Sequence, residues 1–241
     1  MIKSYLNTIV GSFAILSLHA GNIFAAPPPQ NPGVLPPNSH AFGTTYEDLA
    51  GAWFQWAWNI PSEVNPILDQ TGEFCDINQE GKIWFLAGNF GGVSERTCTV
   101  PAGKALFFPL LNGLSLAPEF GETEDEIRQD VNDDIDCRTT PEPPPPEENC
   151  VVDLVCEIDG VPLQDLYAYR TESPEGGFVL SIEEGGLLNQ FGFAPGDREP
   201  AVADGYWILL APLSKGRHVI EFIVLQDPGV EILVTWYIEV I

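Results

Sequence analysis

From residue 82 to the C-terminus, the chain alternates between short apolar segments and turn residues. Each segment is rich in β-branched and aromatic side chains and is bounded by Gly, Pro, Asn or Asp, a pattern typical of strands separated by turns. In the last segment apolar and polar residues alternate, as in an antiparallel strand with one solvent-facing side. The pattern predicts a mostly β protein, an antiparallel β-sandwich of the jelly-roll or immunoglobulin-like type. The predicted strands span residues 82–87, 105–111, 151–158, 178–182, 205–211, 217–225 and 230–241.

One segment before these strands has helical periodicity. Thr45 opens a capping box with Asp48, and apolar residues recur at helical spacing until Pro61. We therefore expect an N-terminal aromatic helix over residues 45–59. Its aromatic side chains cover more of the helix circumference than one buried stripe requires. This predicts either a helix packed between a sheet and a loop or an exposed aromatic platform that stacks on sugars. The aromatic residues are Trp53, Phe54, Trp56 and Trp58.

An acidic insertion at residues 119–150 separates the second and third predicted strands. Thr123 begins a capping box there, and Ile127, Val131 and Ile135 follow at a spacing of four residues. This spacing predicts a short acidic helix on the surface. A proline-rich, acidic loop follows the predicted helix.

The N-terminal part of the chain differs from the rest in composition. Within residues 1–25, Lys3 is the only charge, and the apolar run that follows is too short to span a bilayer. This pattern predicts a secretory signal peptide, and hence a secreted or periplasmic protein that is not inserted in a membrane after cleavage. Residues 26–44 form a proline-rich lead-in, expected to be extended and solvated. Residues 45–241 are expected to form a single β-sandwich domain.

The charge balance excludes two classes of partner. The chain has 35 Asp and Glu residues against 10 Lys and Arg residues, a formal net charge of -25. Such a charge repels phosphate backbones and anionic lipid headgroups, so we expect neither nucleic-acid binding nor electrostatic docking to a membrane. Because the chain has only three His residues, a His-based catalytic network or transition-metal site has few residues to draw on.

Five cysteines follow the predicted signal peptide, and in an exported protein they are expected to pair. Cys75 and Cys98 bracket the first predicted strand, so a disulfide would tie its two ends together. Cys137 and Cys150 flank the proline-rich loop and form the second predicted pair. Cys156 shares the apolar face of its predicted strand, which favours a buried free thiol over a reactive one.

A calcium site is one hypothesis for the acidic residues. Asp76, Asn78 and Glu80, followed by Gly81, match the first half of an EF-hand loop. The twelfth position is Ala87 where that loop has a bidentate carboxylate, so an irregular Ca²⁺ site is the remaining version of this hypothesis. The acidic residues between 130 and 136 are a rival location, or alternatively a solvated helix face. No cofactor other than Ca²⁺ is expected.

Catalytic motifs are sparse. The chain has no G-x-S-x-G motif, and His40 and His218 are the only imidazoles after the predicted signal peptide, so a Ser or Cys hydrolase is not favoured. Two carboxylates at a suitable separation would be enough for glycoside hydrolysis. The candidates near the aromatic helix are Glu63, Asp69 and Glu73.

The few cations are expected to pair with the abundant acids. Arg96, Lys104 and Arg170 are therefore predicted to be held by carboxylates. We interpret Tyr169 and Arg170 as part of an ion pair beneath a loop, or alternatively as a site that recognises an anion.

Three strings, WFLAG at 84–88, VPAGKALFFP at 100–109 and DGYW at 204–207, resemble motifs of a family of exported bacterial β-rich proteins. The likeness extends over most of residues 45–241. It implies export, a link between Cys75 and Cys98, and a single β-rich domain. The family has no assigned activity, so the resemblance implies no catalytic or binding residue. Cys137, Cys150 and the proline-rich loop depart from the family pattern.

These features predict a secreted, acidic extracellular protein that acts as a non-catalytic binding or structural module, with a glycan as one candidate ligand. The expected partners are a polysaccharide or a second copy of the chain. Two alternatives are a carboxylate-dependent glycan-active enzyme and a calcium-dependent adhesion or assembly protein. The candidate binding residues are Trp53, Trp56, Trp58, Tyr169 and Arg170, and the candidate metal ligands are Asp76, Asn78 and Glu80.

Overall fold

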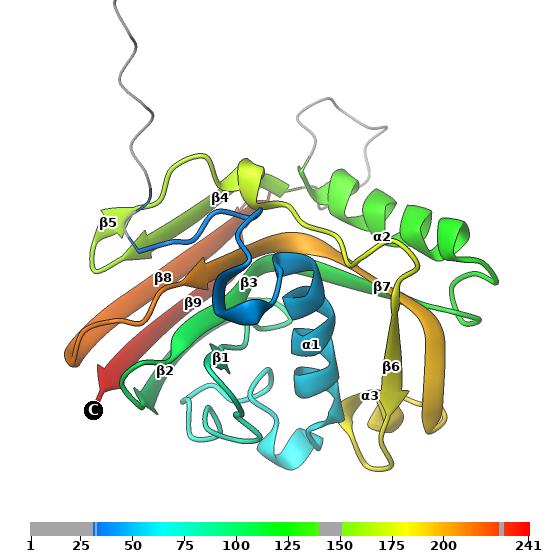
Figure 1. Cartoon of the computed structure of the whole chain (residues 1–241), viewed down its shortest axis with the longest axis horizontal. Coiled ribbons are helices and arrows are strands. Elements are labelled where there is room, and N and C mark those ends of the chain that lie inside the picture. The colour runs from blue at the N-terminus through cyan, green and yellow to red at the C-terminus, as the bar shows by residue number, and fades with distance from the viewer. Residues whose placement is uncertain (1–30, 32, 140–150, 227–228) are drawn as a thin grey trace, which may run out of the picture.

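The computed structural model describes residues 31, 33–139, 151–226 and 229–241 (Figure 1). The predicted signal peptide, the first part of the proline-rich lead-in and the predicted pairing of Cys137 with Cys150 lie outside the described residues. The fold is mostly β, as predicted, with 39% of the residues in strands and 21% in helices. Within the described ranges, no helix is long and apolar enough to cross a membrane.

The strands form two sheets. Sheet A consists of β1 (Ile83–Phe85), β3 (Ala105–Leu116), β7 (Gly196–Leu210) and β6 (Phe178–Ile182), in that order. Sheet B consists of β2 (Gly92–Val100), β9 (Gly229–Val240), β8 (Gly216–Gln226), β4 (Val151–Ile158) and β5 (Val161–Pro162), in that order.

Each sheet contains one parallel pair, β1 with β3 in sheet A and β2 with β9 in sheet B, whereas the other pairs are antiparallel. Both sheets are therefore mixed, and the prediction of purely antiparallel sheets is wrong. The physical reason is the connection between β1 and β3. The chain passes through β2 in the other sheet and returns, and such a crossover allows two strands of one sheet to run in the same direction.

The strand boundaries show where hydrophobic patterning is informative. The bounds of β4 and β6 are those predicted. Strand β7 begins at Gly196, whereas the predicted strand begins at residue 205. The prediction misses the first residues of β7 because most of them are polar. The pattern does not predict β2, whose buried side chains include Ser94, Arg96 and Cys98. Polar residues thus lie on both faces of β2, and the alternation of hydrophobicity is lost.

The two sheets contact each other through apolar faces. Phe108 of β3 stacks on Phe222 of β8, with ring centroids 5.8 Å apart. Strand β9 has the predicted alternation, since Trp236 is buried whereas the adjacent Tyr237 is exposed. Phe107 and Phe108 are consecutive residues of β3 and both are fully buried. Both are covered because a helix, α1 (Tyr46–Asn59), packs on the other face of sheet A.

Helix α1 is the predicted aromatic helix. Its first turn is capped as expected, with Asp48 N donating a hydrogen bond to the Thr45 hydroxyl at 3.1 Å. Sheet A curls around the helix, so that β7 and β6 both contact it (Figure 1).

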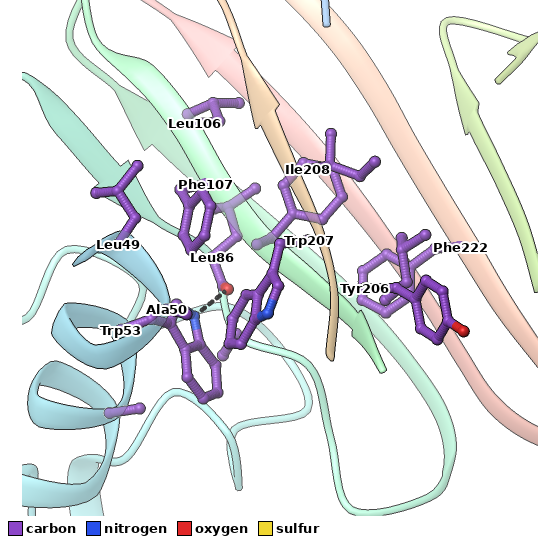
Figure 2. Packing of buried hydrophobic residues seen from close by; sticks show 14 of the residues in the cluster. Leu49, Ala50, Trp53, Leu86, Leu106, Phe107, Tyr206, Trp207, Ile208 and Phe222 are labelled. Atoms are coloured by element: carbon purple, nitrogen blue, oxygen red, sulfur yellow. Dashed lines mark hydrogen bonds between the residues drawn. The ribbon is translucent and has the colours of Figure 1, made fainter. Parts of the chain in front are cut away.

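Trp53 of α1 packs on sheet A (Figure 2). Trp207 of β7 lies flat against Phe107, with ring centroids 5.2 Å apart, and edge-on to Trp53 at 5.7 Å. The Trp53 Nε1–H donates to Leu86 O at 3.0 Å, in the segment that follows β1. The helix is therefore packed between a sheet and a loop, which is the first of the two arrangements predicted from its sequence.

The polar side chains of α1 complete the edge of sheet A at β6. Gln55 Nε2 donates to Ser181 O at 3.0 Å, and Gln55 Oε1 accepts from Ser181 N at 2.9 Å. Asn59 extends the pattern, with its amide donating to Ser181 O and accepting from Glu183 N. These amides supply hydrogen bonds to an edge strand whose outer backbone groups would otherwise lack partners.

A second helix, α2 (Glu124–Thr139), confirms the predicted acidic helix. Its capping box is reciprocal, since Glu126 N donates to Thr123 Oγ1 at 3.3 Å and Thr123 N donates to Glu126 Oε2 at 3.0 Å. The helix packs against β3 and β7. Its three predicted apolar residues are all buried: Ile127, Val131 and Ile135.

The end of the proline-rich lead-in is hydrogen-bonded to sheet A, although residues such as Gly33 and Pro36 are exposed. Leu35 N donates to Leu209 O, and Ala211 N donates to Gly33 O, both at 2.8 Å. The buried Tyr46 hydroxyl links the two segments, because it donates to Leu35 O at 2.6 Å and accepts from Leu209 N at 2.9 Å. Short helices connect the main elements: η1 (Ala41–Gly43), η2 (Ser62–Val64), η3 (Leu166–Tyr169) and α3 (Leu187–Gln190).

A disulfide joins Cys75 and Cys98, as predicted, and ties the loop after α1 to β2. The same loop approaches β2 closely at Gly72, where a Cβ atom would lie 2.3 Å from Thr97 O. Gly72 also has a φ of 86°, which glycine adopts without strain. Cys156 is a free, buried thiol, as predicted, and burial raises its pKa above the ordinary value.

Candidate functional site

A cavity of about 320 Å³ lies between α1, the middle of β3 and two loops. One loop is residues 88–90, which follow β1, and the other is residues 188–193, which include the end of α3. Among the described residues, none that lines the cavity is acidic or basic, and most are apolar. The aromatic side chains in the lining include Trp53, Phe54, Trp58, Phe90, Phe191 and Phe193.

Three aromatic rings meet at the mouth of the cavity. The Trp58 ring lies 5.7 Å from that of Phe90 and 5.8 Å from that of Phe191, and the two Phe rings are 6.1 Å apart. Phe90 is 58% exposed and Phe191 is 54% exposed. Clustered aromatic rings on a protein surface usually mark a binding site, because exposing them to water is unfavourable. The mouth therefore offers an apolar surface that a ligand could cover.

The wall formed by residues 86–90 has irregular backbone, and buried N–H donors hold its carbonyl groups. Leu86 O accepts from Trp53 as described above. Ala87 O accepts from Arg96 Nη1 at 2.8 Å and from Trp236 Nε1 at 3.3 Å, and Gly88 O accepts from Arg96 Nη1 at 3.0 Å. Buried carbonyl groups without donors would be destabilising, so these bonds fix the position of the wall.

Arg96 is fully buried, and the prediction that a carboxylate holds it is wrong. Its other amino group, Nη2, donates to Ile67 O at 3.0 Å, and its guanidinium lies 5.2 Å from the centre of the Trp236 ring. Burial lowers the pKa of Arg96 to about 10, and the nearby negative charge of Asp69 opposes that shift. The cation is stabilised by carbonyl dipoles and an aromatic face, a set of partners that sequence spacing does not reveal.

Two polar groups on lining residues have no hydrogen-bond partner among the described residues. Trp58 Nε1 and Asn112 Nδ2 are both buried and make no hydrogen bond. A buried donor without an acceptor costs about 1–3 kcal/mol. Asn89, a third polar residue in the lining, has hydrogen-bond partners within the protein. Its amide donates to Ser94 Oγ at 2.8 Å and accepts from Gly91 N at 3.0 Å.

The structure brings only some of the predicted binding residues to this cavity. Trp53 and Trp58 line it. Trp56 is buried elsewhere, where its Nε1–H donates to Ile77 O at 2.9 Å and its ring packs on Phe85. The helix periodicity identifies the aromatic face, but it does not distinguish the tryptophan at the cavity mouth from those in the core.

Tyr169 and Arg170 lie at another position along β7. Arg170 forms an ion pair with the fully buried Asp204, with Nη2 and Oδ2 2.5 Å apart. Burial raises the pKa of Asp204, and the hydrogen bond and charge of Arg170 oppose the shift. Tyr169 is buried in η3 and its hydroxyl accepts from Asn31 Nδ2 at 3.1 Å. The prediction that a carboxylate holds Arg170 is confirmed.

The predicted acidic candidates do not line the aromatic cavity. Partial burial of Asp69 opposes its ionisation, but hydrogen bonds from Phe74 N and Thr71 outweigh this effect and lower its pKa. Its carboxylate thus organises the loop that follows α1. Glu63 and Glu73 are exposed.

The predicted calcium ligands Asp76, Asn78 and Glu80 are exposed. Across the described ranges, no three His, Cys, Asp or Glu residues are grouped so that they could hold a metal ion. Lys104, predicted to bind a carboxylate, instead donates to Gly81 O.

His218 makes contacts that resemble a Ser-His-Asp triad, but both of its ring nitrogens are used as donors. Nδ1 lies 2.7 Å from an Asp159 carboxylate oxygen, and Nε2 lies 2.9 Å from Ser214 O and 3.4 Å from Ser214 Oγ. A carboxylate and a carbonyl oxygen both accept, so this geometry suits the doubly protonated imidazolium. A general base would need a free ring nitrogen facing the serine hydroxyl. His40 is exposed.

Comparison of the chain with protein-family models, with curated proteins and with solved structures found no match. The resemblance to a family of exported bacterial proteins therefore stays a prediction. Function has to be inferred from the cavity and its surroundings.

Replacing Arg96 with methionine should destabilise the protein by about 3 kcal/mol, because the Ala87, Gly88 and Ile67 carbonyl groups lose a buried donor. The measurement is the free energy of unfolding in urea. Arg217→Met is the matched control, since the Arg217 side chain is 91% exposed and forms its ion pair with Glu239 at the surface. Equal stability of the two variants would contradict the role assigned to Arg96.

The contacts of His218 predict a pH dependence of stability. Burial lowers the pKa of His218, but its bonds to Asp159 and Ser214 O raise it overall above 6.5. The stabilisation is therefore complete below about pH 6.5 and is lost as the pH rises through the higher folded-state pKa. The free energy of unfolding in urea is measured at about pH 6 and about pH 9. Its change between the two pH values should be smaller for His218→Gln than for the wild type. An identical difference in the two proteins would refute this interpretation.

Proposed function

We propose that the protein is a secreted or periplasmic, non-catalytic binding module whose aromatic cavity takes a small apolar molecule. The observation that carries the proposal is the triad of Trp58, Phe90 and Phe191 at the mouth of an apolar cavity. Burial of apolar surface contributes about 25 cal/mol per Å², so covering exposed rings supplies binding energy.

The size of the cavity agrees with this proposal. Small-molecule sites usually measure roughly 300–1,000 Å³, and a cavity of about 320 Å³ falls at the lower end of that range. A compact ligand, such as a molecule with two fused rings, suits this volume better than a long chain. The sheets and buried carbonyl bonds that hold the walls also favour a preformed site, which lowers the cost of ordering upon binding.

A small apolar ligand fits the lining better than a sugar. A sugar presents several hydroxyl groups, and each needs a polar partner when it is buried. The cavity offers few polar side chains, and Trp53 and Trp56 are packed in the core, so their faces are not free to stack on a glycan. The glycan-active enzyme is not supported at this cavity, because none of the described residues that line it carries a carboxylate.

Two further observations support the proposed location outside the cytosol and the proposed scaffold. The Cys75–Cys98 disulfide agrees with an oxidising compartment outside the cytosol, where disulfides persist. The contact of Phe108 with Phe222 agrees with a sandwich-type scaffold, of which the jelly-roll or immunoglobulin-like form stays a hypothesis.

The proposal is tested with N-phenyl-1-naphthylamine, an uncharged probe whose fluorescence rises in apolar surroundings. The full chain should bind it saturably, and Phe90→Ala combined with Phe191→Ala should weaken binding by about tenfold or more. Tyr237→Ala is the control, since Tyr237 is an exposed aromatic residue on β9 that does not line the cavity. Absence of saturable binding, or equal weakening in the control, would contradict the proposal.

A further inference from the structure

We infer that the ligand of the aromatic cavity carries a neutral hydrogen-bond acceptor, such as a ketone or aldehyde oxygen, that accepts from Trp58 Nε1–H and the Asn112 amide. This inference rests on the proposed binding function and adds the chemical class of the ligand. Its basis is that these two buried donor atoms, both on residues in the cavity lining, have no acceptor within the part of the chain that the structure describes.

Helix α1 provides an internal comparison for Trp58. The other two tryptophans of this helix are buried, whereas the Trp58 side chain is half-buried. Each of those two donates its indole N–H to a backbone carbonyl, Trp53 to Leu86 O and Trp56 to Ile77 O. Trp58 is the member of this set that lacks such a partner, and it is also the one at the cavity mouth. An acceptor brought by a ligand would complete the pattern.

Asn112 supplies a donor from a different element. It lies on β3, whereas Trp58 lies near the end of α1, so the two donors come from two walls of the same cavity. In β3, Asn112 is opposite Gly205 of β7, and a Cβ atom at residue 205 would lie 2.9 Å from the Asn112 Cβ. Gly205 therefore leaves the space that Asn112 occupies.

The surroundings favour a neutral acceptor over an anionic one. No Lys, Arg or His is among the described residues that line the cavity. Arg96, a buried cation that binds the wall at Ala87 and Gly88, is engaged by the carbonyl groups of those two residues and of Ile67. The formal net charge of -25 also opposes the approach of an anion. A neutral carbonyl oxygen accepts from N–H donors without bringing an uncompensated charge into an apolar site.

The test compares naphthalene, 2-acetylnaphthalene and 2-naphthoate as competitors that displace N-phenyl-1-naphthylamine from the full chain. The three compounds share the fused rings and differ in the acceptor. The ketone oxygen accepts two added hydrogen bonds, so the ketone should bind tighter than naphthalene by about tenfold or more, and also tighter than the carboxylate. Equal displacement by the ketone and by naphthalene, or tighter binding of the carboxylate, would overturn the inference.

Variants of Trp58 and Asn112 test whether these two donors cause the preference for the ketone over naphthalene. Trp58→Phe keeps an aromatic ring and removes the N–H, so the ratio of ketone affinity to naphthalene affinity should fall toward one. Asn112→Leu should lower the same ratio. Trp84→Phe is the matched control, because Trp84 also has a buried N–H without a partner but does not line the cavity. An unchanged ratio in Trp58→Phe, or the same fall in Trp84→Phe, would overturn the assignment.

The outcomes separate this inference from the proposed function. If the wild type does not bind N-phenyl-1-naphthylamine, the proposed function itself fails. If it binds the dye and both uncharged competitors equally, the binding function stands and the acceptor class is wrong. Circular dichroism of each variant verifies folding, and Trp58→Phe alone decides the test if Asn112→Leu does not fold.

Discussion

The packing of α1 on the curled face of sheet A is the interaction on which the rest of the structure depends. Trp53 and Phe54 contact Trp207, and Trp207 in turn stacks on Phe107 of β3. Because these rings are buried, the contacts tie the helix to two neighbouring strands over a large apolar area. They also fix the direction in which the helix leaves the sheet, and so place Trp58 at the mouth of the cavity. The same helix thus contributes to the core and to the candidate site.

Side-chain donors hold the irregular backbone around this helix. Arg96 binds three carbonyl groups, and the Gln55 and Asn59 amides cover the edge of β6. Gln79 does the same at the other edge of sheet A, since its amide donates to Phe85 O at 2.8 Å and accepts from Phe85 N at 2.9 Å. Such bonds prevent buried or half-buried backbone groups from lacking partners. They explain how loops with little regular structure can form rigid walls.

The sequence predicts the elements that depend on local patterns. The caps at Thr45 and Thr123 and the periodicity that follows them identify both long helices, and the spacing around the first predicted strand identifies the Cys75–Cys98 link. It does not predict β2, because Arg96 points inward where the hydrophobic alternation requires an apolar residue. Local sequence patterns do not predict the cavity either. Its walls come from segments far apart in the chain, and Trp58 differs from Trp56 only in what the fold places beside it.

The role inferred for Trp58 is to donate its indole N–H to a ligand of the aromatic cavity. Nitrogen-15-edited NMR of the six tryptophan indole groups detects this donor, with the Trp58 resonance assigned by its loss in Trp58→Phe. On titration with 2-acetylnaphthalene, the Trp58 resonance should shift downfield, while that of Trp56, already bonded to Ile77 O, stays in place. A Trp58 resonance that does not move while the compound binds would refute the role inferred for Trp58.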